Sequence, residues 1–276
     1  MHNIKKSIAA FYNETYEGFK MEEHFHNFFE IIYIVDGSAL FNINGKEYRA
    51  CDNNIIFINN FESHNVKLIK YPYKRYYILI DSDYLYSSIK DMRLVSILKC
   101  RTQNFRHVLC ISGQNSAEIY GMIKKLYEEI NNEYDLKDIA LKSYFSLLFT
   151  FIYREFKPYF MPDSYGSLSN EILKIQKYIE DHYNEDITLG KAAGLFYMDR
   201  YYLSHIFKKV TGYTFREYVI RQRLSKAKDM LYYTDETITD ICTDSGFNNV
   251  NNFIRTFKNY EGITPHRYRK KYRKLY

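Results

Sequence analysis

The segment that decides the fold contains one pattern twice: TLGKAAGLFYMDRYYLSHIFKKVTGYT at Thr188–Thr214 and TITDICTDSGFNNVNNFIRTFKNYEGIT at Thr237–Thr264. Tyr197 of the first copy corresponds to Gly246, and Gly212 corresponds to Gly262 after one additional residue. Each copy has a Thr before a short segment and an Asp or Asn before a longer one, and these residue types favour helix N-termini. The repeat therefore predicts two helix-turn-helix units.

The longer segment of each copy predicts a helix with one apolar side and one polar side. The apolar residues are Leu203, Ile206 and Phe207 in the first copy, and Phe253 and Phe257 in the second. The polar side is free to enter a DNA groove. We expect DNA contacts from these residues: Tyr201, Ser204, His205 and Lys208, then Asn249, Asn251, Asn252, Arg255 and Lys258. Because Asn can bond adenine and Arg can bond guanine bidentately, the second copy is expected to provide more direct base readout.

A helix from Thr214 to about Tyr232 is predicted between the two copies. Thr214 and Glu217 have the spacing of a capping box, and an apolar stripe follows. A rod of this length can hold two reading helices about 34 Å apart, which is one turn of DNA. After the second copy, Thr264-Pro265 starts a last helix, HRYRKKYRKLY at His266–Tyr276, whose dense positive charge suits phosphate contacts.

The positive charge of the chain is concentrated in the same region. From Asn170 onward the sequence has 19 Lys and Arg against 13 Asp and Glu, so this part carries the whole net charge of +6. Such an asymmetry favours a polyanionic partner for the C-terminal part alone, although a basic domain without such a partner has the same charge.

The first hundred residues predict an antiparallel β-barrel or sandwich. Between Glu23 and Asp81 there are short runs rich in Ile, Tyr, Phe and Val. Turn residues separate the runs at Asp36-Gly37, Asn44-Gly45, Asn59-Asn60 and Tyr71-Pro72. Many short strands with close turns are typical of antiparallel barrels and sandwiches.

A set of polar residues in this region could form a site. Gly18, His24, His26, Glu30 and Gly37 have the spacing G-x5-H-x-H-x3-E-x6-G, and His64 follows later. If this segment is a strand, His24, His26 and Glu30 point to one side. The set resembles the first cupin motif, with His64 in the place of the second motif's histidine; the Gly, Pro and Gly of that second motif are replaced by Asn53, Asn59 and Phe61. Three interpretations stay open: a metal site, a polar pocket for a small ligand, and a satisfied polar core.

The segment Asn115–Phe156 predicts two amphipathic helices, with stripes that include Ile119, Leu126, Ile139 and Leu147. They can cover the barrel or pair with a second subunit, and we favour a homodimer. Lys157–Asn170 has two of the four prolines together with Gly and Ser, and this composition predicts an interdomain linker.

The segment RLSKAKDMLYYTDETITDICTDSGFNNVNNFIRTFKNYEGITPHRYRK resembles the signature of the AraC/XylS family of transcription regulators. With the cupin-like N-terminus, the resemblance implies an α+β chain with three parts: a cupin-like effector domain at 1–112, a helical segment for dimerisation at 113–160, and an AraC-type DNA-binding domain with two helix-turn-helix units at 169–276. It also implies a small-molecule effector such as a sugar at His24, His26, Glu30 and His64, promoter DNA and RNA polymerase as partners, and no catalysis or cofactor. The alternative is a metal-dependent cupin enzyme with a helical appendage.

The remaining features predict a cytoplasmic protein. No apolar run reaches the roughly 20 residues that span a bilayer, and we expect no signal peptide. The four cysteines form no CxxC pair, which favours buried free thiols in a reducing compartment.

Overall fold

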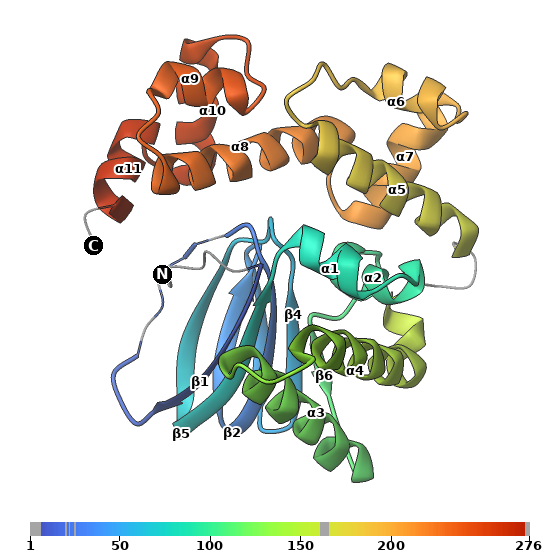
Figure 1. Cartoon of the computed structure of the whole chain (residues 1–276), viewed down its shortest axis with the longest axis vertical. Helices are drawn as coiled ribbons and strands as arrows, with labels where there is room; N and C mark the ends of the chain where they lie inside the picture. The colour runs from blue at the N-terminus through green and yellow to red at the C-terminus, as the bar shows by residue number, and fades with distance from the viewer. Residues whose placement is uncertain (1–6, 20, 22, 25, 161–165, 274–276) are drawn as a thin grey trace. The chain divides into compact units, whose positions relative to one another are not determined.

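The structure is a computed structural model that describes residues 7–19, 21, 23–24, 26–160 and 166–273 (Figure 1). The chain divides into two compact units, Met1–Asn170 and Glu171–Tyr276. Each unit has its own cluster of buried apolar residues. The helices predicted at 113–160 belong to the first unit.

The first unit contains one antiparallel sheet of six strands, which confirms the predicted β-domain. The strand order is β1-β5-β2-β4-β6, and β3 pairs with β2. Among the described residues, β1 and β6 end this path and do not pair with each other. The strands are β1 Ile8–Thr15, β2 Phe29–Ile43, β3 Lys46–Cys51, β4 Asn54–Ile58, β5 His64–Ile80 and β6 Val108–Cys110.

Two of the predicted turns are wrong, because Asp36-Gly37 and Tyr71-Pro72 lie inside the long strands β2 and β5. The β2–β5 pairing shifts register between Ile34 and Ala39, so both strands bend there without ending. Gly37 has a φ of +88°, and a Cβ at this position would lie 2.3 Å from the carbonyl oxygen of Pro72. The Gly and Pro therefore mark a bulge with close backbone approach. The turn at Asn44-Gly45 is confirmed.

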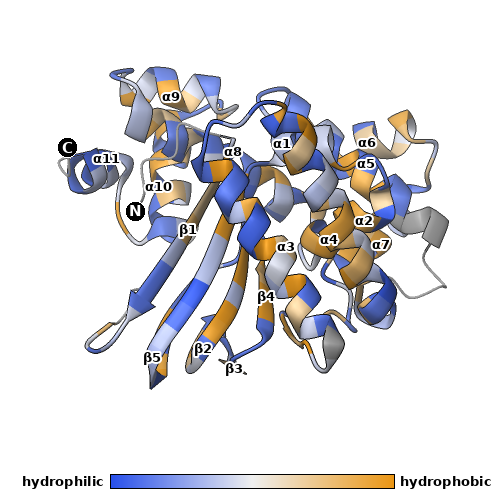
Figure 2. Ribbon diagram, turned by 60° about the horizontal axis from the view of Figure 1, so that its bottom comes forward, coloured by the Kyte–Doolittle hydropathy of each residue, from blue (hydrophilic) through white to orange (hydrophobic). Residues whose placement is uncertain are grey.

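Both faces of the sheet are covered, which explains why β4 is buried along its whole length. On one face Ile32, Ile34, Phe41, Tyr73 and Tyr77 belong to the apolar cluster of the unit. On the other face, the rings of Tyr33 and Tyr76 lie 6.1 and 6.2 Å from Tyr120, and Phe57 lies 6.1 Å from Phe160. These two partners are on helices, so the second face packs against the helical layer. In Figure 2, β4 and α4 are coloured largely as hydrophobic.

The two predicted amphipathic helices are confirmed as α3 Gln114–Asn131 and α4 Lys137–Phe160. Four elements were not predicted: strands β1 and β6, and helices α1 Ser82–Ser88 and α2 Met92–Lys99. Asp81 and Asp91 accept hydrogen bonds from backbone N–H groups at the starts of α1 and α2, and such N-caps are the sequence signal for them. The predicted linker is partly helical, because α4 continues past a kink at Phe156 to Phe160. Residues 161–165 of this linker lie outside the described part.

The second unit is all-helical and contains both predicted helix-turn-helix pairs, α6–α7 and α9–α10. The expected N-caps Thr188 and Asp199 bond the helix starts, and Thr214 and Thr237 form capping boxes. The helices are α5 Gly166–His182, α6 Leu189–Leu195, α7 Arg200–Thr211, α8 Phe215–Tyr233, α9 Ile238–Asp244, α10 Val250–Glu261 and α11 Pro265–Arg273.

Helix α8 is the shared support of the second unit. Its 19 residues give a length of about 28 Å. Leu224, Ala227 and Leu231 of α8 pack with Phe253 and Phe257 of α10 in one buried cluster. The Lys228 ammonium of α8 also lies 3.2 Å from the Glu261 carboxylate at the end of α10. Burial lowers the pKa of Lys228 to about 8, and the charge of Glu261 opposes this shift.

A close contact at Gly246 connects the second helix-turn-helix pair to the loop between α5 and α6. Gly246 has a φ of +84°, and a Cβ there would lie 2.7 Å from both Asn184 Cα and the Tyr183 carbonyl oxygen. Arg223 of α8 holds the same loop, because its Nε donates to Tyr183 O at 2.8 Å and its Nη2 donates to Glu185 O at 2.7 Å. The loop after α5, the rod α8 and the turn of the second pair therefore meet at one point.

We predict that Gly246→Ala destabilises the protein by about 3 kcal/mol or more, because the new methyl group meets backbone atoms as well as an unfavourable φ. Gly262→Ala is the matched control: its φ is +74°, but a Cβ there meets nothing within 4 Å. We expect the control to cost about 1 kcal/mol. Urea unfolding of both variants measures the difference, and equal costs would contradict the close contact.

Candidate DNA-binding surface and effector site

The first predicted DNA-reading helix is α7, and its polar side is exposed as expected. Tyr201, Ser204, His205 and Lys208 are all exposed, whereas Leu203 and Phe207 are fully buried. The N-cap Asp199 accepts a hydrogen bond from Tyr202 N at 2.9 Å, which leaves the start of the helix well ordered. The fold therefore presents these four side chains together on one helix face.

The second predicted reading helix is α10. Asn251, Asn252, Arg255 and Lys258 are exposed, and Arg255 Nη2 donates to Asn252 Oδ1 at 3.2 Å. Asn249 differs from these four, because its Oδ1 accepts from Asn252 N at 2.9 Å as the N-cap. Its amide group still has N–H donors that can reach a partner. The ordered Arg255–Asn252 pair gives α10 two adjacent hydrogen-bonding groups.

The turn before α7 has the left-handed backbone that Gly usually adopts. Tyr197 has a φ of +54° and is 97% exposed. The conformation is thus the same type as at Gly246, but the two turns differ in their surroundings. Tyr197 can replace Gly because its side chain points to solvent and not into a neighbouring segment.

The terminal basic helix α11 divides into two groups of residues. Arg269 Nη2 donates to Glu236 O at 2.6 Å, and Arg273 pairs with Asp235 at 2.6 Å, so these two hold the loop after α8. Arg267, Lys270 and Lys271 are exposed. The expected phosphate contacts therefore narrow to these three residues; Lys274 lies outside the described residues.

In the first unit, the four predicted ligand-binding residues come together although they do not share one strand. Glu30 is on β2, His64 begins β5, His24 forms an isolated bridge with His64, and His26 lies between β-elements. The expected strand alternation from His24 to Glu30 is therefore wrong, because β2 begins only at Phe29. Ring nitrogens of the three histidines nevertheless lie within 4.8 Å of one another.

The hydrogen bonds of this cluster orient two imidazoles toward Glu30. The Nδ1–H groups of His26 and His64 donate to the carbonyl oxygens of Phe28 and Glu62, at 2.9 and 3.1 Å. Both Nε2 atoms then lie 3.3 Å from Glu30 Oε2, and the His64 contact is an ion-pair contact that lacks hydrogen-bond geometry. Burial raises the pKa of Glu30, but the two imidazoles outweigh it and hold this pKa well below its usual range.

This arrangement is compatible with two protonation states of His26 and His64. If both Nε2 atoms carry protons, the Glu30 carboxylate is held by two imidazolium groups. For His64, burial lowers the pKa, but Glu30 outweighs burial and raises it. Without those protons, the inward Nε2 lone pairs and a carboxylate are the donors that transition metals use, and Nδ1–H bonds to carbonyls are typical of metal-bound histidines.

A second buried acid, Glu62, anchors the loop that carries His64. Arg101 binds its two carboxylate oxygens at 2.7 and 3.0 Å, and His107 Nε2 lies 2.9 Å from Oε1. Burial raises the pKa of Glu62, but Arg101 and His107 outweigh it and keep the pKa well below its usual range. Because the Glu62 backbone accepts from His64, this network positions the histidine.

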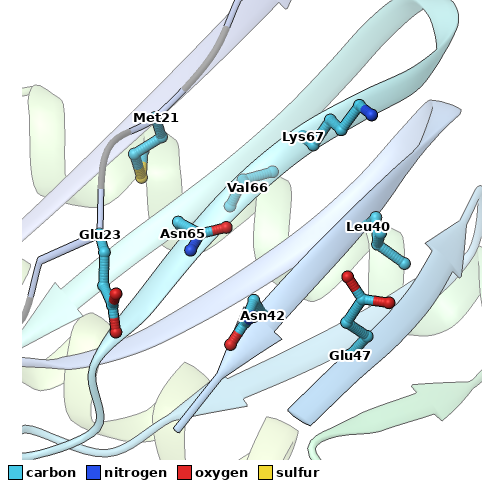
Figure 3. A pocket seen from close by; sticks show the side chains of 8 residues that line it. All are labelled: Met21, Glu23, Leu40, Asn42, Glu47, Asn65, Val66 and Lys67. Carbon is cyan, nitrogen blue, oxygen red and sulfur yellow. The ribbon is translucent and has the colours of Figure 1, made fainter. Parts of the chain in front are cut away.

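A separate pocket of about 370 Å³ lies at the ends of β2, β3 and β5 (Figure 3). Its lining combines carboxylates, amides, one amine and apolar groups, and it contains none of the four predicted ligand-binding residues. The lining residues are Met21, Glu23, Leu40, Asn42, Glu47, Asn65, Val66 and Lys67. Glu23 and Glu47 are exposed, so this pocket is a surface depression and not a desolvated site.

Comparison with known proteins agrees with this two-unit architecture. The sequence model of the AraC-like ligand binding domain matches residues 10–149, and that of a helix-turn-helix domain matches residues 192–271. The chain belongs to the AraC family of transcription regulators. It thus combines an N-terminal ligand-binding domain with a C-terminal helix-turn-helix domain that binds DNA.

Named AraC-type relatives match different shares of the chain. The HTH-type transcriptional activator RhaS of Mannheimia succiniciproducens is 26% identical over 261 residues, which cover 88% of this chain and 87% of that protein. The regulator YtdP of Bacillus subtilis is 39% identical over 111 residues, but the match spans only 14% of that protein. ToxT of Vibrio cholerae is similar in fold, with a TM-score of 0.62 at 19% identity over 96% of this chain and 98% of that one.

Two further expectations concern membrane helices and cysteines. Within the described residues, no helix has the length and apolar character needed to cross a lipid bilayer. All four cysteines are free; Cys100 and Cys242 are buried as expected, but Cys51 and Cys110 are exposed. The expectation of buried thiols is therefore correct for only half of them.

We predict that substitutions on α10 and α11 have different effects on DNA binding. Arg255→Ala should relax the preference at one base pair by about 1–3 kcal/mol, because a guanine contact is lost. Lys271→Ala should weaken binding to all DNA sequences alike and reduce the steepness of log affinity against log salt concentration by about 0.9. DNA selection with both variants and salt titration measure these effects. An unchanged preferred site for Arg255→Ala would contradict the assigned face of α10.

Proposed function

We propose that this protein regulates transcription by binding promoter DNA in a sequence-specific manner under the control of a small organic effector. The observation that carries the proposal is the pair of exposed polar faces on α7 and α10, which one rod supports. A rod of about 28 Å suits two helices that enter successive turns of a major groove. We infer that the protein acts in the cytoplasm and contacts RNA polymerase at the promoter.

The proposed effector site is the face of the sheet that carries the apolar cluster of the first unit, near His24, His26, Glu30 and His64. These residues combine hydrogen-bonding groups with an apolar surrounding, which is typical of small-molecule sites. A crystal structure of ToxT has a bound unsaturated fatty acid; that chain is 17% identical to this one, with a TM-score of 0.57. The comparison supports a small organic ligand, such as a sugar or another metabolite, without specifying which.

A footprint on promoter fragments chosen from random DNA tests the proposal. We expect full-length protein to protect two adjacent major-groove segments on one face of the DNA, because α7 and α10 are fixed to α8. The Arg255→Ala variant serves as the control for specificity. Binding that shows no sequence preference at moderate salt would refute the proposed function.

The alternative is a metal-dependent cupin enzyme, which the cluster of His24, His26, His64 and Glu30 favours. Elemental analysis of the purified protein separates the two. Stoichiometric iron, manganese or zinc that is lost in His64→Ala supports a metal centre. Metal-free protein with intact DNA binding removes the alternative.

We further propose that two copies associate through α4. Ile139 and Leu147 are 63% and 54% exposed and lie on the side of α4 opposite its buried residues, and Leu136, directly before the helix, is 74% exposed. A second copy of the same helix is a fitting partner, because such a stripe is self-complementary across a twofold axis. Two copies would also place two DNA-binding units on one promoter.

We predict that the Ile139→Glu/Leu147→Glu double variant is monomeric, because the charges oppose burial of the α4 stripe. Sedimentation velocity of full-length protein measures the state. Ile69→Glu is the matched control, since Ile69 is an exposed apolar residue on β5. We expect the control to remain dimeric; a double variant that stays dimeric would place the interface elsewhere.

A further inference from the structure

A buried arginine lies on the face of the sheet that carries the apolar cluster, and it has no anionic partner in the described part of the chain. Arg75 lies on β5 and is only 7% exposed. Its backbone partners in the sheet are Ile34 of β2 and Asn13 of β1. Among the described residues, it forms no ion pair, and its buried Nη1 atom has no hydrogen-bond partner. Burying a guanidinium charge without a counter-charge costs free energy of folding, so the position of Arg75 inside the sheet requires an explanation.

Three aromatic rings surround the guanidinium of Arg75. Its Cζ atom lies 5.2, 5.1 and 5.5 Å from the ring centres of Phe19, Tyr73 and Tyr77. Tyr73 and Tyr77 flank Arg75 on β5 and belong to the apolar cluster of the first unit. Cation–π contacts compensate part of the desolvation of the guanidinium, but they provide no hydrogen-bond acceptor for the buried Nη1 atom.

Two acidic side chains on the neighbouring strands, Glu14 and Glu30, have other partners. On β1, Glu14 accepts from Tyr12 and Tyr16 and contacts Lys74 at 4.0 Å. On β2, Glu30 contacts His26 and His64. Because Glu14 and Glu30 already have these partners, neither serves as the counter-ion of Arg75.

The Tyr73 hydroxyl is a second donor in the same place. Its oxygen is buried and has no hydrogen-bond partner among the described residues. Burial raises the pKa of Tyr73 to about 12, and the nearby Arg75 charge opposes that shift, although the two groups do not meet with hydrogen-bond geometry. The hydroxyl is therefore protonated at neutral pH and available as a donor.

We propose that Arg75 and Tyr73 bind the carboxylate of a small organic acid whose apolar body lies against Phe19 and Tyr77. The planar guanidinium matches the two oxygens of a carboxylate. A phosphate fits less well, because its additional oxygens and charge would need more donors than this apolar surrounding provides. This inference rests on the proposed effector role of the first unit and gives the chemical class of the effector.

Calorimetry and thermal shift of full-length protein without DNA test the carboxylate site. The probes are butanoate, octanoate, benzoate and phenylacetate, each against its neutral amide, together with inorganic phosphate. We expect at least one carboxylate to bind and to raise the melting temperature while its amide does not. If no carboxylate exceeds its amide, or if phosphate binds more tightly, the proposal is wrong.

Three variants connect binding to Arg75. Arg75→Met should weaken the carboxylate about 30-fold or more, because one partner of a buried charge pair is lost. Arg75→Lys keeps the charge without the planar fork and should bind with intermediate affinity. Arg49→Met, at an exposed arginine of β3, should bind like the parent. Equal carboxylate affinity of Arg75→Met and the parent would overturn the assignment.

A structural role of Arg75 makes a different prediction. If the guanidinium serves only the fold, Arg75→Met lowers the melting temperature of the ligand-free protein; for a ligand-binding group we expect no decrease, because an unpaired buried charge is removed. Footprinting of the same variants separates the two proposals. Carboxylate binding without any DNA preference refutes the regulator alone, and DNA binding that responds to a different class of molecule refutes the carboxylate site alone.

Discussion

The close approach at Gly246 is the constraint on which the DNA-binding unit depends. At this point the second turn meets the backbone of Tyr183 and Asn184, and Arg223 of α8 holds the same loop through two carbonyl groups. The contact joins the turn of the second helix-turn-helix pair to the loop between α5 and α6, and Arg223 joins the same loop to α8. The second pair is therefore held at its turn as well as by its packing against α8.

The two units use buried charge in different ways. In the DNA-binding unit, Lys228 and Glu261 neutralise each other between α8 and α10, so the pair fixes an angle between two helices. In the ligand-binding unit, Glu30 and Glu62 have basic partners, whereas Arg75 does not. Satisfied charges thus belong to the scaffold, and the unsatisfied one indicates where an external group fits.

Sequence reasoning was most successful where local chemistry decides the structure. The caps at Thr188, Asp199, Thr214 and Thr237 follow from side-chain hydrogen bonds within one helical turn, and the predicted helix starts are confirmed. It was wrong at Asp36-Gly37, where local turn preference is overridden by pairing with distant β5. It also missed Arg75, because an arginine among tyrosines in a strand gives no sequence signal for burial; only the alternation of β5 against β1 and β2 places it inside.

The difference between the two turns has an evolutionary consequence. Tyr197 and Gly246 have the same left-handed backbone, but the first faces solvent and the second is enclosed by backbone. Position 197 therefore accepts many residues that tolerate this conformation, whereas position 246 excludes every side chain. After a duplication of an ancestral helix-turn-helix pair, the turn of the second pair is held by its neighbours and the turn of the first pair is left free to vary without loss of the fold.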